Sequence, residues 1–294
     1  MDLIVPLRAP ACARLDAVGG KAANLHALLA AGLPVPGGFV VTTRAYREAT
    51  AALAPALTPL FDRLREPSLD AAQLSEVAAR IREFVSLIDL PPGFVAELAT
   101  DYAGLGEHAA VAVRSSATAE DLADASFAGQ QDSYLHVVGA DAVRDAVHAC
   151  WASLWTARAV AYRHARGIDP ADVALAVVVQ RMVETRCAGV MFTADPVSGS
   201  RQRLVIDANP GLGEAVVSGE VDPERYVVAA DTGRVLERRP GTRTLAVRPR
   251  PGGGVQRADL EPDDSPVLSA SDLAALGDLG RRAQTAFGGP QDTE

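Results

Sequence analysis

A short polar stretch after an apolar segment has the residue types that bind a polyphosphate. Arg114 follows an apolar run at residues 109–113, which predicts a buried strand. The residues with hydroxyl groups or no side chain that follow it, up to a second predicted strand at 133–138, are Ser115, Ser116, Thr118, Gly129 and Ser133. A guanidinium makes charge-assisted hydrogen bonds to phosphate, and glycine lets the backbone approach a ligand closely. The alternative is a surface loop with one exposed arginine, the commoner meaning of such a pattern taken alone.

A lysine near the N-terminus stands at the predicted start of a helix. Gly19 and Gly20 precede Lys21, and leucines follow at helical spacing up to a Gly-Leu-Pro stop at residues 32–34. A cation in the first turn opposes the helix dipole, whereas an anion there is favoured by the N–H groups. Lys21 therefore suits a site that also holds a phosphate. The alternative is a solvated lysine on a helix.

A third candidate lies where a long apolar run ends. The β-branched run at residues 173–183 predicts a strand that is buried on both faces. It reaches the polar Gln180 and passes into a linker at residues 182–184. Backbone N–H and C=O groups at such a strand end can pair with an adenine edge as another base does. The alternative is a central strand with one glutamine at its edge.

The remaining patterns predict the elements that position these residues. Helices are expected at 42–54 and at 70–88, the second with Ser68 or Asp70 as its cap, and a further short helix is expected to end at Tyr102. Two more are expected at 140–166 and at 271–287, the last with Ser269 or Ser271 as its cap. Further strands are expected at 188–196 and 203–207, as a hairpin, and between 225 and 247, whereas 249–266 is expected to be a mobile surface loop. Trp151 and Trp155 share one apolar stripe, which indicates core rather than a platform for a base.

Composition limits the classes of function. The chain has 294 residues, 48% of them hydrophobic, enough for two subdomains and a sizeable core. A net charge of −9 argues against a nucleic-acid partner but not against a nucleotide, which needs only a local cluster of cations. The 3 cysteines and 5 histidines lack metal-ligand spacing, so neither a disulfide framework nor a zinc site is expected. Without a signal peptide or an apolar run of membrane-spanning length, the expected location is the cytoplasm, with no membrane partner.

Several segments, taken in order, resemble one family of nucleotide-binding domains. They are Gly19-Gly-Lys-Ala-Ala-Asn-Leu25, Val35-Pro-Gly-Gly-Phe39, Arg114-Ser-Ser-Ala-Thr-Ala-Glu-Asp121, Ser126-Phe-Ala-Gly-Gln130, Phe192-Thr-Ala-Asp-Pro196 and Gly211-Leu-Gly-Glu-Ala-Val-Val-Ser-Gly219. This order is similar to the ATP-binding domain shared by phosphoenolpyruvate synthase, pyruvate phosphate dikinase and rifampicin phosphotransferase. That domain resembles the ATP-grasp fold. The resemblance implies an α/β (α+β) domain of two subdomains, residues 1–168 with the phosphate-binding cations and 169–294 with the adenine-binding strand and the metal carboxylate, and a nucleotide in the cleft between them.

The resemblance also implies a role for each candidate. Lys21 and Arg114 would place positive charge on the phosphoryl oxygens of ATP, and Glu294 would hold Mg²⁺, which prefers oxygen ligands. The residues that would bind the nucleotide are these two cations together with Gly129, Ser133, Gln180, Met182, Val183, Glu184 and Glu294. At the C-terminus Thr293 stands where the family usually has an apolar residue. Asp207 and Glu214 could lie near the metal or the ribose, or could cap a local turn.

The reaction that the resemblance implies splits ATP into AMP and phosphate and passes the β-phosphate through a histidine on a swivelling domain to an acceptor. Its catalysis depends on positioning and electrostatics. The histidine domain and the acceptor-binding domain are expected outside these residues, in a missing C-terminal part or in separate chains. Rifampicin phosphotransferase is the most similar branch, and phosphoenolpyruvate synthase is the alternative. A second alternative is a non-catalytic nucleotide-binding module that regulates a partner.

Overall fold

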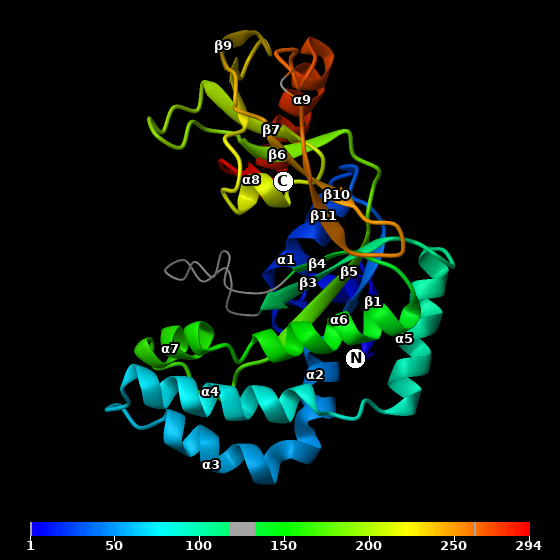
Figure 1. Ribbon diagram of the computed structural model, residues 1–294, viewed down its shortest axis with the longest axis vertical. Helices are drawn as coiled ribbons and strands as arrows, with labels where there is room; N and C mark the ends of the chain where they lie inside the picture. Colours follow the sequence, from blue (N-terminus) through cyan, green and yellow to red (C-terminus); the bar gives the residue numbers. More distant parts are fainter. Residues whose placement is uncertain (1, 118–132, 262) are drawn as a thin grey trace. The chain divides into compact units, whose positions relative to one another are not determined.

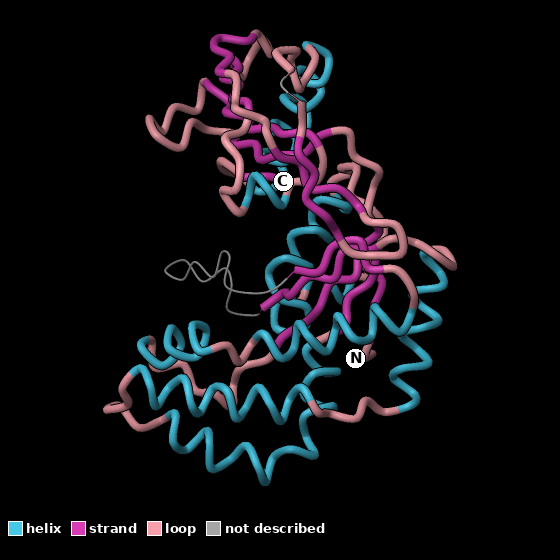
Figure 2. Tube along the Cα trace, viewed as in Figure 1, coloured by secondary structure: helices cyan, strands magenta, loops and turns pink. Residues whose placement is uncertain are grey.

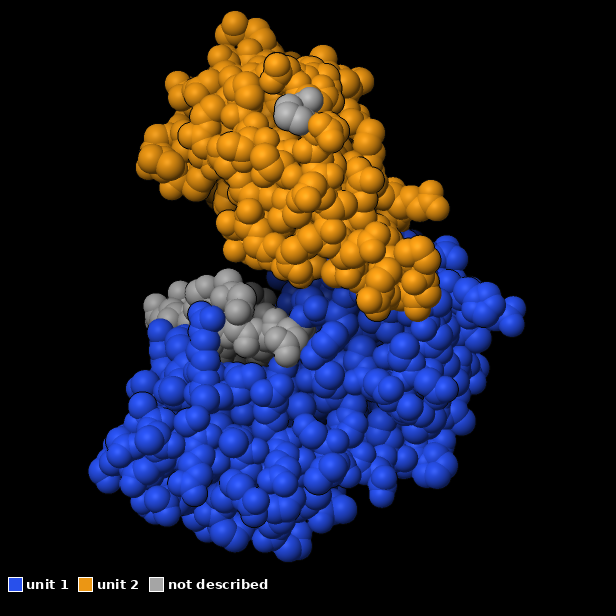
Figure 3. All heavy atoms as spheres, in the orientation of Figure 1, with its two compact units in different colours: residues 1–27, 36–182 blue, residues 28–35, 183–294 orange. Residues whose placement is uncertain are grey.

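The chain is built of two compact units, which Figure 3 shows in different colours. The computed structural model describes residues 2–117, 133–261 and 263–294. Unit 1 contains residues 1–27 and 36–182, and unit 2 contains residues 28–35 and 183–294. Most helices belong to unit 1 and most of unit 2 is strand or loop (Figure 2), a mixture that confirms the expected α/β class. Within those three described ranges, no helix is long and apolar enough to cross a membrane.

Unit 1 is an antiparallel sheet with helices packed on it (Figure 1). Its strands are β1 (Ile4–Pro6), β2 (Gly38–Val41), β3 (Val111–Ala117), β4 (Ser133–Val137) and β5 (Leu175–Arg181), in the order β1-β2-β5-β3-β4. Its helices are α1 (Leu15–Ala30), α2 (Thr43–Thr50), α3 (Ala54–Leu64), α4 (Ala71–Ser86), α5 (Pro92–Leu105), α6 (Ala140–Ser153) and α7 (Ala157–Ala165), with 3₁₀ turns at Pro10–Ala13 and Ala51–Leu53. The last residues of α1 belong to unit 2.

The main core of unit 1 lies between one face of this sheet and helices α4, α5 and α6. Val113 on β3 and Val177 on β5 point into it, as expected for a central strand buried on both faces. Trp151 and Trp155 are 0% and 1% exposed, which confirms that these tryptophans belong to the core. The opposite face of the sheet carries the alternate residues, because successive side chains of a strand point to opposite sides.

The single helix expected at residues 140–166 is wrong, because the chain bends after α6 and starts α7 anew. Thr156 has an extended conformation, and its hydroxyl accepts a hydrogen bond from Ala159 N. Between the two helices the Trp155 ring nitrogen donates to the Tyr46 hydroxyl at 2.9 Å. The apolar spacing runs on across this break, so periodicity alone hides it. A local cap and a distant hydrogen bond end the first helix.

Unit 2 contains two antiparallel sheets and one long helix. The larger sheet has the order β12-β6-β7-β8-β9, from strands β6 (Cys187–Phe192), β7 (Arg203–Pro210), β8 (Glu224–Ala229), β9 (Val235–Arg239) and β12 (Asp292–Thr293). The smaller sheet pairs β10 (Leu245–Pro249) with β11 (Val255–Asp259), and the helices are α8 (Glu214–Val217) and α9 (Ala270–Phe287). The expected hairpin of β6 and β7 is confirmed. The expected loop at 249–266 is wrong in part, because β11 within it pairs with β10.

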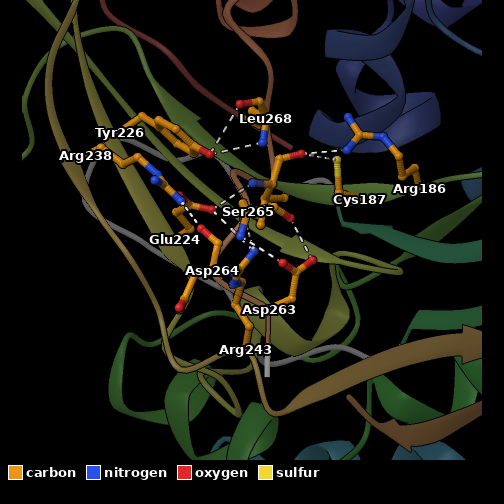
Figure 4. Close-up of polar contacts among 11 residues, drawn as sticks. Arg186, Cys187, Glu224, Tyr226, Arg238, Arg243, Asp263, Asp264, Ser265 and Leu268 are labelled. Atoms are coloured by element: carbon orange, nitrogen blue, oxygen red, sulfur yellow. Dashed lines mark hydrogen bonds and ion pairs between the residues drawn. The ribbon is translucent and has the colours of Figure 1, made fainter. Parts of the chain in front are cut away.

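A buried carboxylate organises the segment that leads into α9 (Figure 4). Glu224 on β8 is 0% exposed, forms an ion pair with Arg238 of β9 and lies 3.8 Å from Arg243. It also accepts the N–H of Val267 at 2.8 Å. The neighbouring Tyr226 hydroxyl accepts the N–H of Leu268 at 3.0 Å. These bonds satisfy a charge that would be costly to bury alone, and they fix the chain just before the helix.

Candidate functional site

A glycine kink in α1 brings the Lys21 motif against strand β3. Gly19 has φ 72° and ψ 170° inside a segment that is otherwise helical. A Cβ atom at this position would lie 2.1 Å from the carbonyl oxygen of Ser116. Only glycine combines this left-handed conformation with so close an approach. The Gly19–Gly20 pair therefore sets the position at which the following helical turn meets the sheet.

Two hydrogen bonds then hold this turn to β3. The Lys21 Nζ donates to the carbonyl oxygen of Ser115 at 2.9 Å, and Ala22 N donates to the Ser116 Oγ at 3.1 Å. The hydroxyl thus satisfies an N–H at the start of a helical segment, as an N-cap does, although it comes from 94 residues away. Ser115 and Ser116 are 1% and 0% exposed, whereas Lys21 is half-buried. The first two predicted motifs meet here.

Arg114 and Ser133 are neighbours in the sheet. Arg114 of β3 pairs with Ser133 of β4 on one side and with Val178 of β5 on the other. Directly paired residues share a face, so Arg114 and Ser133 lie on the face opposite the main core, together with Ser116. Arg114 is half-buried and Ser133 exposed. The structure brings Lys21, Arg114 and Ser133 together, whereas the candidate Gly129 lies outside the described residues.

Lys21 has a further distinction in the sequence. It is the only lysine in the chain, so every other member of the 28 Lys+Arg residues is an arginine. A lysine ammonium is a compact point charge, whereas a guanidinium is a wide planar fork. The half-buried Lys21 thus offers a compact charge beside β3.

Gln180 is on the same face of the sheet but is mostly buried. It pairs with Ala112 of β3, two positions along the strand from Arg114, or about 7 Å. Its side chain is 8% exposed, and its Nε2 donates to the carbonyl oxygen of Pro36 at 3.1 Å. One donor of the amide group is thus already used inside unit 1.

The linker after β5 starts with a residue whose N–H is also in use. Met182 N donates to the carbonyl oxygen of Ala110 at 2.9 Å. The Met182 sulfur is 2.9 Å from the His136 backbone nitrogen, at a β-bulge of β4. Of the Met182 backbone, the carbonyl is the group left for a ligand. Val183, 57% exposed, and Glu184, also exposed, follow as the first residues of this part of unit 2.

The last candidate, Glu294, lines a cavity of about 460 Å³ whose walls all belong to unit 2. Strand β12 delivers it there by pairing Asp292 with Phe192 and Thr293 with Met191. The Thr293 hydroxyl donates to the Met191 carbonyl at 3.3 Å, and this hydrogen bond explains why a polar residue is tolerated at position 293. The cavity is lined by Val190, Phe192, Asp207, Val216, Val217, Gly219, Val221, Asp222, Pro223, Arg225, Arg239 and Glu294.

Two ion pairs lie in the described wall of this cavity, beside Glu294. Arg225 donates to both carboxylate oxygens of Asp207, at 2.7 and 2.6 Å, and these hydrogen bonds raise the pKa of Arg225 above its usual value. Arg239 makes a single bond of 3.1 Å to Asp222. No group of three metal-ligand side chains occurs among the residues that the structure describes. One carboxylate still fits Mg²⁺, which usually keeps several waters and takes its other ligands from phosphates.

The pair of Asp207 and Arg225 is the feature that sequence reasoning left out. From the sequence, Asp207 could lie near the metal or the ribose or could cap a local turn, and Arg225 receives no role. The two residues face each other on β7 and β8 in the register Asp207↔Arg225. Opposite charges at facing strand positions would have been a signal, but they can be read only once the register is known.

Comparison with known proteins shows the family to which the chain belongs. The family described as "Pyruvate phosphate dikinase, AMP/ATP-binding domain" matches residues 15–294. The chain belongs to this family. It is 46% identical over 99% of its length to a rifampicin phosphotransferase of Streptomyces sp and 41% identical over 96% to that of Bacillus subtilis (strain 168). It is also 42% identical over 94% of its length to a probable phosphoenolpyruvate synthase of Methanothermobacter thermautotrophicus.

The match covers only part of each relative. The chain spans 34%, 33% and 41% of the length of these three proteins, in the order given above. The family assignment therefore concerns an AMP/ATP-binding domain of an enzyme family. The sequence-based recognition of this family is confirmed.

Proposed function

We propose that this chain is the ATP-binding part of a dikinase-type phosphotransferase. The observation that carries the proposal is the meeting of Lys21 with β3 beside Arg114, through a kink that admits no Cβ atom. Two cations on a rigid support suit a polyphosphate, because charge-assisted bonds to phosphate oxygens are about twice as strong as neutral ones. The family match supports the choice of ATP.

The proposed reaction has ATP, water and an acceptor hydroxyl as reactants. Its products are AMP, inorganic phosphate and the phosphorylated acceptor, with the β-phosphate carried in between by a histidine nitrogen of another domain. The two bridging P–O bonds of the β-phosphate break, and water supplies the oxygen of the released phosphate. Lys21 and Arg114 offset the charge on the phosphoryl oxygens and hold them in line, which is the main catalytic need of phosphoryl transfer.

The remaining candidates receive roles that respect their contacts. We assign the adenine edge to the Met182 carbonyl and the backbone of Val183 and Glu184, because the Met182 N–H is already bonded. Gln180 would offer its amide oxygen, while its NH₂ group stays with Pro36. Gly129 and Ser133 would line the phosphates. Glu294 would be a carboxylate ligand of Mg²⁺, the cation that neutralises the polyphosphate when bound.

Titration calorimetry with ATP and Mg²⁺ tests the proposal directly. We expect wild-type protein to bind, and Lys21→Ala and Arg114→Ala to weaken binding about 10- to 100-fold, the effect of losing a charged hydrogen bond. Lys21→Arg should not restore full affinity, since a planar fork of donors does not reproduce the compact ammonium charge. Arg80→Ala, which breaks an exposed pair with Glu83, is the control and should leave affinity unchanged. Wild-type affinity in both alanine variants would refute the site.

The single lysine allows a second test. An amine-reactive ATP analogue can modify only one side chain of this protein, because Lys21 is the only lysine. We expect peptide mapping to locate the label at Lys21 and excess ATP to prevent the modification. Labelling of the N-terminal amine alone, unaffected by ATP, would contradict the assignment.

The acceptor and the remaining domains are proposed from the relatives. We favour a rifamycin hydroxyl as the acceptor, because a rifampicin phosphotransferase is 46% identical over 99% of this chain. Pyruvate is the second candidate, supported by the 42% identity to a probable phosphoenolpyruvate synthase. Incubation with labelled ATP and the C-terminal part of the Streptomyces relative, with rifampicin or pyruvate added, separates them. AMP formation that requires rifampicin supports the first; AMP formation that requires pyruvate overturns it; no AMP with either favours a regulatory module.

A further inference from the structure

The ion pair of Asp207 and Arg225 lies in the wall of the unit 2 cavity. Asp207 on β7 and Arg225 on β8 are directly opposed, and two short hydrogen bonds join them in a fork. The Asp207 side chain is 11% exposed and that of Arg225 is 40% exposed. The Asp207 carboxylate is therefore mostly buried, whereas the Arg225 guanidinium is partly exposed to solvent. A bidentate contact of this kind fixes the plane of the guanidinium.

The fork leaves binding capacity on the side of the arginine. A guanidinium has five N–H donors, and Arg225 uses its Nε and one hydrogen of its Nη2 on Asp207. Asp207 is its only hydrogen-bond partner among the residues that the structure describes. The remaining donors belong to a residue that lines the cavity. They are held by the carboxylate in a fixed orientation, so a ligand that binds them does not have to order the side chain.

The charges of the cavity narrow the class of ligand. Its wall has three carboxylates, Asp207, Asp222 and Glu294, but two guanidinium groups, Arg225 and Arg239. An anion alone would be repelled by the net negative charge of the wall, and a cation alone would be repelled by the two arginines. An oxyanion that carries its own divalent cation satisfies both, because the cation suits a carboxylate and the oxygens suit a guanidinium.

We infer that Arg225 is a further binding cation for the magnesium-bound polyphosphate, and that Asp207 is the residue that positions it. The inference rests on the proposed function and adds to it a cation of unit 2. Arg239 offers a matched comparison, because it lines the same cavity but is held by one bond of 3.1 Å to an exposed Asp222. A single bond does not fix the orientation of a long side chain, so Arg239 should contribute little.

Calorimetry with three probes separates a phosphate contact from a loss of structure. The probes are ATP with Mg²⁺, inorganic tripolyphosphate with Mg²⁺, and adenosine. We expect Arg225→Gln to weaken binding of ATP and of tripolyphosphate about 10- to 100-fold and to leave adenosine unchanged. Asp207→Asn should weaken the two phosphate ligands by a smaller factor, because the amide can hold Arg225 with one bond only. Arg239→Gln should weaken the two phosphate ligands less than Arg225→Gln does, because one bond does not fix its side chain. Arg80→Gln, which breaks an exposed pair with Glu83 in unit 1, is the control and should bind all three probes as wild type does.

A double variant guards against unfolding. Replacing the pair by Asp207→Asn with Arg225→Gln keeps two facing amides of similar size and leaves no buried carboxylate unpaired. It should melt close to the wild-type temperature and still lose the phosphate affinity. Unchanged ATP affinity in this variant and in Arg225→Gln overturns the inference and leaves the proposed function intact. Equal losses for adenosine and tripolyphosphate also overturn it. A wild-type protein that binds no ATP refutes the proposed function itself.

Discussion

The candidate phosphate-binding residues of unit 1 and the cavity of unit 2 are held in place by different kinds of contact. In unit 1, Gly19 and Ser116 place Lys21 through close backbone packing and a hydroxyl group. In unit 2, Asp207 and Arg225 are held by charge. The arrangement in unit 1 depends on the missing side chain of Gly19 and on the Ser116 hydroxyl, so its stability should not change with pH. The second depends on ionised carboxylates, so the two units should fail under different challenges.

The largest effect should come from neutralising the buried carboxylate of unit 2. Glu224→Gln leaves Arg238 and Arg243 beside a group without charge, and breaking a buried pair costs about 3–5 kcal/mol. The free energy of unfolding should fall by this amount in a denaturant titration. Hydrogen exchange of β8 serves as the local measurement. Glu237→Gln on the exposed strand β9 is the control. A loss below about 1 kcal/mol would mean that charge does not hold unit 2 together.

A close second effect is expected from a single methyl group in unit 1. Gly19→Ala places a Cβ 2.1 Å from a backbone oxygen in a left-handed conformation, so we expect a loss of about 2–4 kcal/mol in unfolding free energy. ATP affinity should fall with it. Gly104→Ala in α5, where nothing lies within 4 Å, should instead be neutral or stabilise slightly. Equal melting temperatures for the two variants would show that the kink is not needed.

A smaller effect isolates the hydroxyl that joins the two motifs. Ser116→Ala removes the acceptor of Ala22 N, and a lost cap of this kind costs about 1–2 kcal/mol. Differential scanning calorimetry should show the decrease at pH 7 and equally at pH 5, since no charge is involved. The exposed Ser75→Ala on α4 serves as the comparison and should not destabilise. A pH-dependent loss at Ser116 would contradict the contrast drawn between the units.

Acidification should lower the stability of unit 2 more than that of unit 1. Hydrogen bonds from serine or arginine groups lower the pKa of four carboxyls in unit 2, namely Asp195, Glu220, Asp263 and Asp272. Their contribution to stability is present above the unfolded pKa of about 4 and is lost as pH falls through the lower folded values. In unit 1, hydrogen bonds from arginine likewise lower the pKa of Asp16 and Asp169, but burial raises the pKa of Glu97 and Asp101. For these last two the sign is reversed, because protonation favours the folded state.

We therefore expect unit 2 to lose protection first as the pH falls from 7 to about 3. Both tryptophans of the chain, Trp151 and Trp155, are in unit 1, so their fluorescence reports on that unit alone. Hydrogen exchange of α9 and β8 reports on unit 2. The protection of these amides should be lost at a higher pH than the pH at which the tryptophan fluorescence changes. A fluorescence change that precedes the exchange would reverse the comparison.

Some features of the fold could be predicted because their causes are local. The β-branched run at β5 predicts a central strand, and Ser269 with Asp272 forms the capping box that starts α9. The helix ends where Gly288 adopts the left-handed conformation. The break at Thr156 could not be predicted in this way, because the apolar spacing continues across it and a contact with Tyr46 decides it. Strand β11 could not be predicted, because the Pro- and Gly-rich composition of residues 249–266 also fits a loop.

The sequence by itself determined the residue types and the family, since these depend on motifs whose members are close together along the chain. Lys21, Arg114 and Glu294 could be named from such motifs. Only the tertiary structure decided that Lys21 contacts Ser115 across 94 residues and that Asp207 faces Arg225. The physical reason is register: a shift of one residue sends a strand's side chains to the other face, and the packed core, not the local sequence, selects which register forms.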